Sequence, residues 1–490
     1  MRKISIPTKL SYGVGQVAEQ IKVQGFDAFV FFYFNQILGL EGWLTGAAVA
    51  GALMVDAVTD PMIGSISDNF RSKYGRRHPF MFAAALPLGL FWALLFFPPN
   101  GLDQLGLFIW LLGFAILIRS SMTLYHVPHL ALGAEMSDDY HERTSIVSYR
   151  VMFGVIGGAM TTIISLTYFF PETAGFQNPL LNAEGYPKVA IFGGVVMTTT
   201  ILISAIGTLK EVPHLPSAPL NPTAFSLKRV YGEFNQAWNN PSFRAIFLGV
   251  CFSAISYGVT QTLATHMNVF FWKFSPSEIA MLAAVYVPGF FTAGAIAQIL
   301  HKKFDKKTVL IIAAMLVGLL ANLGVALNLL GLFPVDEKGT AAIEVVMVFV
   351  FILSFSMALI FISAASMMAD IAQEHLYETG KSQQGIFLSA TAFSAKLASG
   401  IGHLVSGIGI SFIEFPVQAT DPTQVPSTLI QQLALLYLAG SLVGLFAILF
   451  FNRYRITKER FAIISQVKAN KMGETSTEEA SSADKSLEPT

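Results

Sequence analysis

The sequence has 490 residues, of which 53% are hydrophobic and only 13% are charged, and its mean hydropathy is +0.57. Soluble multidomain proteins need more polar surface than this to cover their cores, so the composition argues against a soluble protein. The formal net charge is zero, which gives no indication of a nucleic-acid partner, and the single cysteine, Cys251, excludes a disulfide framework within the chain.

Apolar runs of about 20 residues, the length that crosses the hydrocarbon core of a bilayer, recur along the whole chain. They are too numerous for a signal peptide or a single anchor. We therefore predict an all-α membrane protein with twelve transmembrane helices. These spans fall at approximately residues 11–38, 43–66, 79–98, 104–133, 144–170, 187–209, 242–271, 277–300, 308–331, 341–369, 384–413 and 428–451.

Basic residues gather on one side of these spans. They precede the first span or follow the second, eighth and twelfth: Arg2, Lys3, Lys9, Arg71, Lys73, Arg76, Arg77, Lys302, Lys303, Lys306, Lys307, Arg453, Arg455, Lys458 and Arg460. The opposite loops hold Lys188, Lys273 and Lys338. By the positive-inside rule we expect a multi-pass protein of the cell (inner) membrane with both termini in the cytoplasm, which requires an even number of spans.

The chain shows signs of an internal duplication. The basic turn Lys73-Tyr-Gly-Arg-Arg77 follows the second span, and Lys303-Phe-Asp-Lys-Lys307 follows the eighth, 230 residues later. Equal placement of these turns in two sets of six helices indicates duplicated halves, an architecture in which substrate and ion sites lie between the halves near mid-membrane. Between the halves, a Pro-rich stretch precedes apolar residues at helical spacing, which predicts an amphipathic helix on the cytoplasmic surface. We divide the chain into an N-terminal six-helix half, a cytoplasmic linker, a C-terminal six-helix half and a largely disordered cytoplasmic tail, at residues 1–209, 210–241, 242–452 and 453–490.

Two carboxylates lie inside the second span. Asp56 and Asp60 are four residues apart, which places them one turn apart on the same helix face. A carboxylate at the centre of a spanning helix costs about 2.5–3.5 kcal/mol on insertion scales. Deprotonated together, the two repel each other and need a cation, a proton or a basic partner. This demand predicts an ion-coupled carrier, and the alternative is a structural pair held by basic side chains without an ion.

Several motifs resemble those of one transporter family, and the similarity covers spans one to twelve and is strongest in the first five. In chain order they are Lys9-Leu-Ser-Tyr-Gly13, Val55-Asp-Ala-Val-Thr-Asp-Pro61, Gly64-x-x-x-Asp68, Arg71-Ser-Lys-Tyr-Gly-Arg-Arg77, His126-Val-Pro-His-x-Ala-Leu-Gly133, Asp138-Asp-Tyr-x-Glu-Arg-Thr144 and Lys396 in the eleventh span. Together they resemble the glycoside–pentoside–hexuronide:cation symporters of the major facilitator superfamily.

The resemblance implies a coupling site and a function. In that family a helix-two carboxylate pair binds the coupling cation beside a helix-four hydroxyl, and the matching residues here are Asp56, Asp60 and Thr123. Such oxygen ligands suit a hard monovalent cation, and the sequence does not decide between Na⁺ and H⁺. A buried ammonium needs a carboxylate partner, so we expect Lys396 to pair with the two aspartates. The implied activity is cation-coupled symport of a small molecule across the lipid bilayer, by a monomer that is not an enzyme and has no cofactor beyond its coupling ion.

The substrate-binding residues are predicted from polar positions in the first half. The sugar-binding carboxylates of the family are replaced by Gln20 and His126, whereas a basic residue is kept as Arg150. Gln20 and Asp27 also belong to a polar stripe on the first span, which must face water or protein, and helix–helix hydrogen bonding is the alternative. Arg119 shares a face with His126 and either neutralises the aspartate pair or holds an anionic substrate group.

The sequence does not determine the identity of the substrate. We favour a glycoside or oligosaccharide. An acidic saccharide such as a uronide is preferred because Arg119, His126 and Arg150 are basic, and because Gln20 and His126 replace carboxylates that would repel an anion. The second candidate is an amphiphile such as a lysophospholipid, because the carriers of such lipids resemble the same family and also share a His-Val-Pro motif, here His126-Val-Pro128. A membrane enzyme is disfavoured because the sequence has no His-Glu-x-x-His and no Gly-x-Ser-x-Gly motif.

Overall fold

The computed structural model describes residues 3–172, 175–216, 227–337, 339–379, 384–457 and 459–461. These residues are mainly helical, and the β pairing found among them is an isolated bridge between Val335 and Ala341. In this part of the chain, ten helical segments are long and apolar enough to cross a membrane. They are formed by α3 (Gly42–Asn69), α4 (His78–Leu95), α5 (Gln104–Glu135), α6 (Tyr140–Tyr168), α7 (Gly185–Thr208), α9 (Pro241–His266), α10 (Pro276–Lys303), α11 with α12 (Lys306–Met315 and Ala321–Leu329), α13 (Ile343–Thr379) and α15 with α16 (Ser427–Leu442 and Phe446–Phe451).

The other two predicted spans are also helical. The eleventh span is α14 (Gln384–Phe412). The first is built from shorter segments in succession, α1 (Ile6–Val14), α2 (Gln16–Gly25) and the π-helical turns η1 (Phe26–Val30) and η2 (Tyr33–Ile37). π turns are frequent at functional sites because they re-aim side chains out of the regular helical register. Each of the twelve predicted spans therefore falls on helical structure.

The boundaries of several helices follow from capping residues. The side chains of Asp103, Asp139 and Asn240 accept hydrogen bonds from the first backbone N–H groups of α5, α6 and α9. Ser275 and Glu278 form a reciprocal capping box at the start of α10. Asp139, in the motif Asp138-Asp-Tyr-x-Glu-Arg-Thr144, is thus the N-cap of α6.

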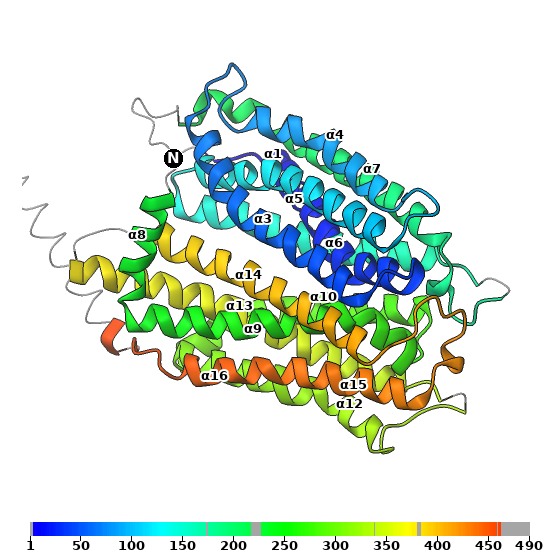
Figure 1. Ribbon diagram of the computed structural model, residues 1–490. Coiled ribbons are helices and arrows are strands. Elements are labelled where there is room, and N and C mark those ends of the chain that lie inside the picture. The colour runs from blue at the N-terminus through cyan, green and yellow to red at the C-terminus, as the bar shows by residue number, and fades with distance from the viewer. Residues whose placement is uncertain are drawn as a thin grey trace, which may run out of the picture.

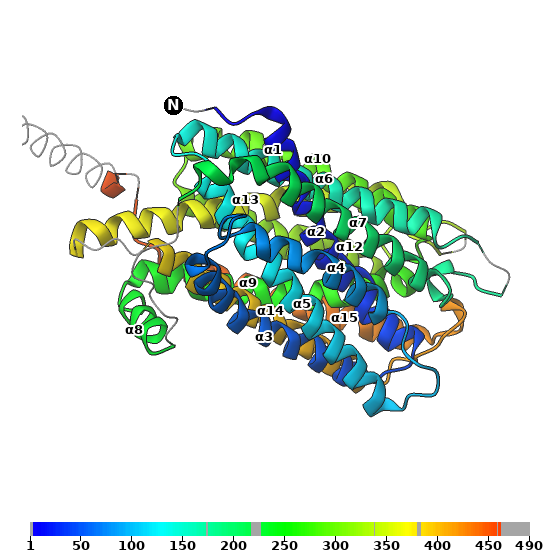
Figure 2. The same cartoon turned by 90° about the horizontal axis from the view of Figure 1, so that it is seen from above.

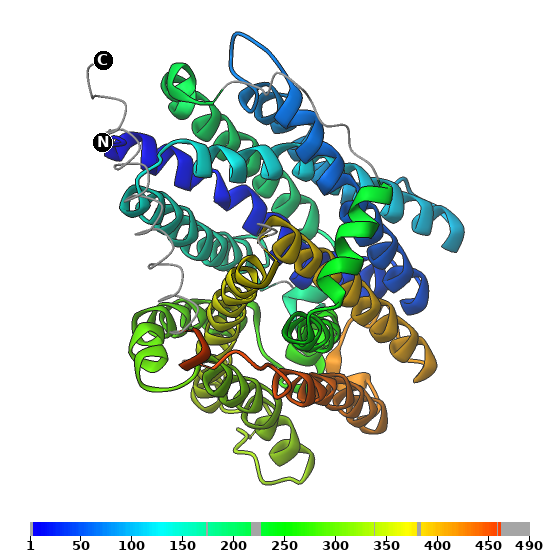
Figure 3. The ribbon, with the colours of Figure 1, turned by 90° about the vertical axis from the view of Figure 1, so that its left-hand side faces the viewer.

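The helices form two groups that lie side by side. In Figure 1 the helices up to α7 occupy the upper part of the molecule, and those from α9 onward occupy the lower part. The end-on view in Figure 3 shows the same division. Between the two groups, α14 packs against both α3 and α9. The residues of α3 and α14 therefore face each other across the junction.

The two groups meet closely at the end of the bundle predicted to be external. There the N–H of Gln418 donates to the carbonyl of Gln36 at 2.7 Å, and the N–H of Trp43 donates to Ser411 Oγ at 3.0 Å. Glycines let α3 and α14 approach at this end, since a Cβ on Gly407 would lie 2.2 Å from a backbone oxygen of α3.

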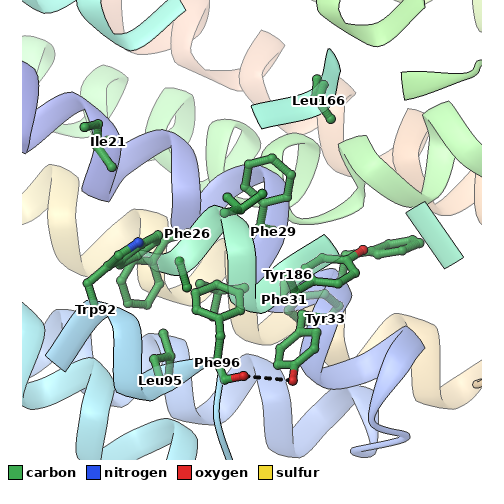
Figure 4. Packing of buried hydrophobic residues seen from close by; sticks show 14 of the residues in the cluster. Ile21, Phe26, Phe29, Phe31, Tyr33, Trp92, Leu95, Phe96, Leu166 and Tyr186 are labelled. Atoms are coloured by element: carbon green, nitrogen blue, oxygen red, sulfur yellow. Dashed lines mark hydrogen bonds between the residues drawn. The ribbon is translucent and has the colours of Figure 1, made fainter. Parts of the chain in front are cut away.

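Aromatic packing holds the outer part of the first helix in place. Figure 4 shows its aromatic side chains packed against Trp92, Phe96 and Tyr186 of neighbouring helices. The rings of Tyr33 and Tyr186 are 4.8 Å apart, and the Tyr33 hydroxyl donates to the carbonyl of Phe96 at 3.2 Å. The two π turns are therefore tightly anchored within the first group of helices.

The linker forms the predicted helix. It starts with a 3-10 segment (Leu209–His214), and α8 (Leu227–Trp238) follows at the end of the bundle where the N-terminus lies, as Figures 1 and 2 show. Phe234 and Trp238 of α8 contact Phe247 of α9, so the apolar face covers the C-terminal group of helices. The predictions for residues 217–226 and for the tail beyond residue 461 lie outside the described residues.

Candidate functional site

The two aspartates of α3 share one hydroxyl group. Thr123 Oγ1, from α5, lies 2.9 Å from Asp56 Oδ1 and 2.8 Å from Asp60 Oδ1. A hydroxyl has one proton, so Thr123 donates to one carboxylate at a time and its lone pairs stay available. The structure therefore brings the three predicted cation ligands together in one constellation.

Two basic side chains lie on the same carboxylates. Lys396 Nζ, from α14, is 3.1 Å from Asp56 Oδ2 and also contacts Asp60 Oδ2. Arg119 Nη1, from α5, is 3.3 Å from Asp56 Oδ2. The Asp56 side chain is only 4% exposed, whereas that of Asp60 is 32% exposed. Two negative and two positive charges thus neutralise each other in a site that reaches across both groups of helices.

An aromatic ring also contacts the Arg119 guanidinium. The guanidinium carbon lies 4.8 Å from the centre of the Phe26 ring, a cation–π arrangement. The Arg119 side chain is 7% exposed. Of the two roles predicted for Arg119, this geometry favours neutralisation of the aspartate pair.

Thr59 is a further oxygen donor that the sequence analysis missed. Its hydroxyl donates to the carbonyl of Asp56 at 3.3 Å and lies 3.5 Å from Thr123 Oγ1. Its place in the motif Val55-Asp-Ala-Val-Thr-Asp-Pro61, between the two aspartates, was the available signal. Two carboxylates and two hydroxyls form an all-oxygen set of the kind that hard cations prefer.

The polar stripe of the first helix is partly self-satisfied. Gln16 and Gln20 donate through Nε2 to Glu19 Oε2 at 3.1 and 3.2 Å, and Lys22 Nζ lies 3.7 Å from the same carboxylate. Gln24 Oε1 accepts a hydrogen bond from Thr162 of α6. Part of the stripe therefore serves hydrogen bonding within and between helices, which was the alternative to substrate contact.

His126 and Arg150 are two residues of the first group of helices that have buried side-chain nitrogens without a hydrogen-bond partner. Neither side chain makes a hydrogen bond or an ion pair with a described residue, although His126 Nδ1 and Arg150 Nε are buried. His126 lies close enough to Glu19, and also to Lys22, Arg150 and Asp60, for electrostatic interaction. Buried polar nitrogens without a protein partner are available to a ligand.

Asp27 points to the other group of helices. Its Oδ2 accepts hydrogen bonds from the Tyr257 hydroxyl at 2.9 Å and from Gln261 Nε2 at 3.3 Å, both on α9. In the C-terminal group, His403 and His266 are also hydrogen-bonded within the protein. His403 bonds to Thr262 at 2.6 Å, and His266 bonds to Asn35 at 3.2 Å.

Comparison with known proteins identifies the class. The sequence matches the family described as "MFS/sugar transport protein" over residues 11–458. It is 22% identical to the isoprimeverose transporter of Lactiplantibacillus pentosus, over 94% of this chain and 91% of that protein. It is 25% identical to sodium-dependent lysophosphatidylcholine symporter 1 of Mus musculus, over 94% of this chain and 87% of that protein. The fold resembles the inward-open xylose transporter XylE of E. coli, with a TM-score of 0.61, 14% identity, and coverage of 94% of this chain and 98% of that one.

These findings define a multi-pass membrane protein with the major facilitator fold. The chain belongs to the MFS/sugar transport protein family, because the match extends over nearly its whole length.

Proposed function

We propose that this protein is a secondary active transporter that couples the movement of a glycoside or oligosaccharide to that of Na⁺ or H⁺. The observation that carries the proposal is the charge-balanced constellation of Asp56, Asp60, Arg119 and Lys396. A cation-coupled carrier needs a carboxylate site that holds either its ion or an internal positive charge, because an empty pair of buried carboxylates is costly.

The geometry links the cation to the movement of the halves. The aspartates are on α3 in the N-terminal half, whereas Lys396 is on α14 in the C-terminal half. Lys396 holds the oxygens that Na⁺ would bind, and a proton on either aspartate would weaken the same ion pair. Binding of the coupling ion therefore releases Lys396 and breaks a bond between the halves. Without the ion, Lys396 neutralises the pair and allows the empty carrier to return.

We propose that Gln20, His126 and Arg150 bind the substrate. His126 and Arg150 offer buried nitrogens without a hydrogen-bond partner in the protein, and Arg150 provides a planar cation. A fixed guanidinium in a low-dielectric cavity binds a carboxylate more strongly than a neutral hydroxyl, so an acidic saccharide such as a uronide fits best. Asp27 is the further candidate for substrate hydroxyls.

We propose an orientation with both termini in the cytoplasm, following the basic residues. In that orientation the close contacts of α3 with α14 lie on the external side, which supports an inward-facing state. The protein acts as a monomer, has no enzyme activity and takes no cofactor beyond its coupling ion.

Uptake into proteoliposomes tests this function. Neutral glycosides, uronides and lysophospholipids are offered under an imposed Na⁺ gradient, an H⁺ gradient or neither. We expect concentrative uptake of a saccharide, preferably acidic, under one of the two gradients, and none with Asp56→Asn. Accumulation of lysophospholipid alone would establish the second candidate, which the similarity to the mouse symporter favours. Exchange of no substrate in any condition would refute transport.

A further inference from the structure

Asp27 differs from the other acidic side chains near the centre of the bundle. Asp56 and Asp60 contact basic side chains, but no described Lys, Arg or His lies within ion-pair distance of Asp27. Its partners are the neutral donors Tyr257 and Gln261, and both reach the same oxygen, Oδ2. Among the described residues, nothing donates a hydrogen bond to Oδ1.

The charged groups around Asp27 are already engaged. Two basic residues are close enough to act on it electrostatically, but each has a carboxylate of its own: Lys22 contacts Glu19, and Arg119 contacts Asp56. The titratable groups that face Asp27 from the packed helices are Lys22 in α2, Arg119 in α5, Tyr257 in α9 and Tyr286 in α10. None of them supplies a dedicated countercharge.

A carboxylate in this position gains most by binding a proton. The Asp27 side chain is partly buried. Partial removal from water without a countercharge penalises the charged form and favours the neutral acid. The hydrogen bonds to Oδ2 remain possible in the neutral acid because that oxygen keeps its lone pairs, and the proton can reside on Oδ1.

We propose that Asp27 is a proton-binding site separate from the Asp56–Asp60 pair, and that it holds its proton while the first helix is in contact with α9. When the halves separate here, Tyr257 and Gln261 move away with α9, and the carboxyl group, which is partly buried in this structure, becomes fully hydrated. The proton then passes to water, and the carboxylate is hydrated. The transport cycle thus binds and releases one proton at a junction between the halves, in addition to the coupling ion.

Infrared difference spectroscopy tests this site without any substrate. The purified full-length protein in liposomes is titrated with pH, and the C=O stretch of neutral carboxylic acids is followed. The variants are Asp27→Asn, which removes the acid, and Tyr257→Phe, which removes one donor. Asp60→Asn reports on the coupling pair, and Glu184→Gln, in an exposed loop, is the matched control for a carboxylate outside the bundle.

We expect a titrating band in the wild type that is lost in Asp27→Asn and kept in Asp60→Asn and Glu184→Gln. In Tyr257→Phe the midpoint should rise by about one pH unit, because the ionised carboxylate loses a hydrogen bond. Absence of the band in the wild type, its survival in Asp27→Asn or its loss in Asp60→Asn would overturn the proposal. If Asp27→Asn cannot be purified, an unchanged titration midpoint of the C=O band in Tyr257→Phe would likewise overturn the proposal. Because no substrate is present, a failure here would leave the proposed transport function standing.

Discussion

Lys396→Ala tests whether an internal ammonium competes with the coupling cation. Breaking a fully buried ion pair costs about 3–5 kcal/mol. The side chains of Lys396 and Asp60 are 31% and 32% exposed, and Asp56 keeps Arg119 as its partner. The loss should therefore be smaller, about 1–3 kcal/mol. The variant has two carboxylates and one basic residue, so a cation that binds there no longer has to displace an ammonium.

The variant should bind its coupling cation about 5- to 150-fold more tightly. This ratio of dissociation constants corresponds to the loss of about 1–3 kcal/mol given above. Gradient-driven uptake should nevertheless fail, because the empty carrier must return with an unneutralised carboxylate. Radioactive Na⁺ binding to purified protein, and the pH dependence of substrate exchange, measure the affinity for Na⁺ and H⁺. Adding Asp60→Asn to Lys396→Ala should restore expression or exchange. Unchanged or weaker cation binding, together with uptake at the wild-type rate, would refute competition between the Lys396 ammonium and the coupling cation.

Four further outcomes follow from the same geometry. Asp56→Asn should abolish concentrative uptake while the protein still inserts into the membrane, and uptake at the wild-type rate would remove this residue from the coupling site. Arg150→Gln should weaken binding of an acidic saccharide by about tenfold relative to its neutral analogue, the loss of one charge-assisted hydrogen bond. Arg119→Gln should reduce coupled uptake of both analogues, and a selective loss of the acidic one would move Arg119 to the substrate site. Gly407→Ala should slow exchange because its Cβ would lie 2.2 Å from α3, whereas Gly113→Ala, with nothing within 4 Å, should not.

Helix positions were the part of the fold most accessible from the sequence. Apolar runs of membrane length must be helical in lipid, because every backbone N–H and C=O needs a partner within the segment. The irregular first span was not foreseen, because its π turns depend on packing between Phe29, Tyr33 and the neighbouring Tyr186. Local periodicity carries no information on such contacts.

The aspartate pair illustrates what one segment of sequence decides. Asp56 and Asp60 lie on one face because they are four residues apart, and burial among apolar residues demands a countercharge. That demand alone predicts a basic partner, and the family resemblance pointed to Lys396. Which carboxylate each cation contacts, and the pairing of Arg119 with Asp56, followed only from the packing of α3 against α5 and α14.

Asp27 shows the limit of sequence reasoning. It lies on a polar stripe of the first span, and the sequence by itself determined that such a stripe must face protein or water. Only the tertiary structure decided that its partners are Tyr257 and Gln261, some 230 residues further along the chain. Contacts between two halves of a carrier depend on how closed helix bundles dock, and spacing within one helix does not encode that arrangement.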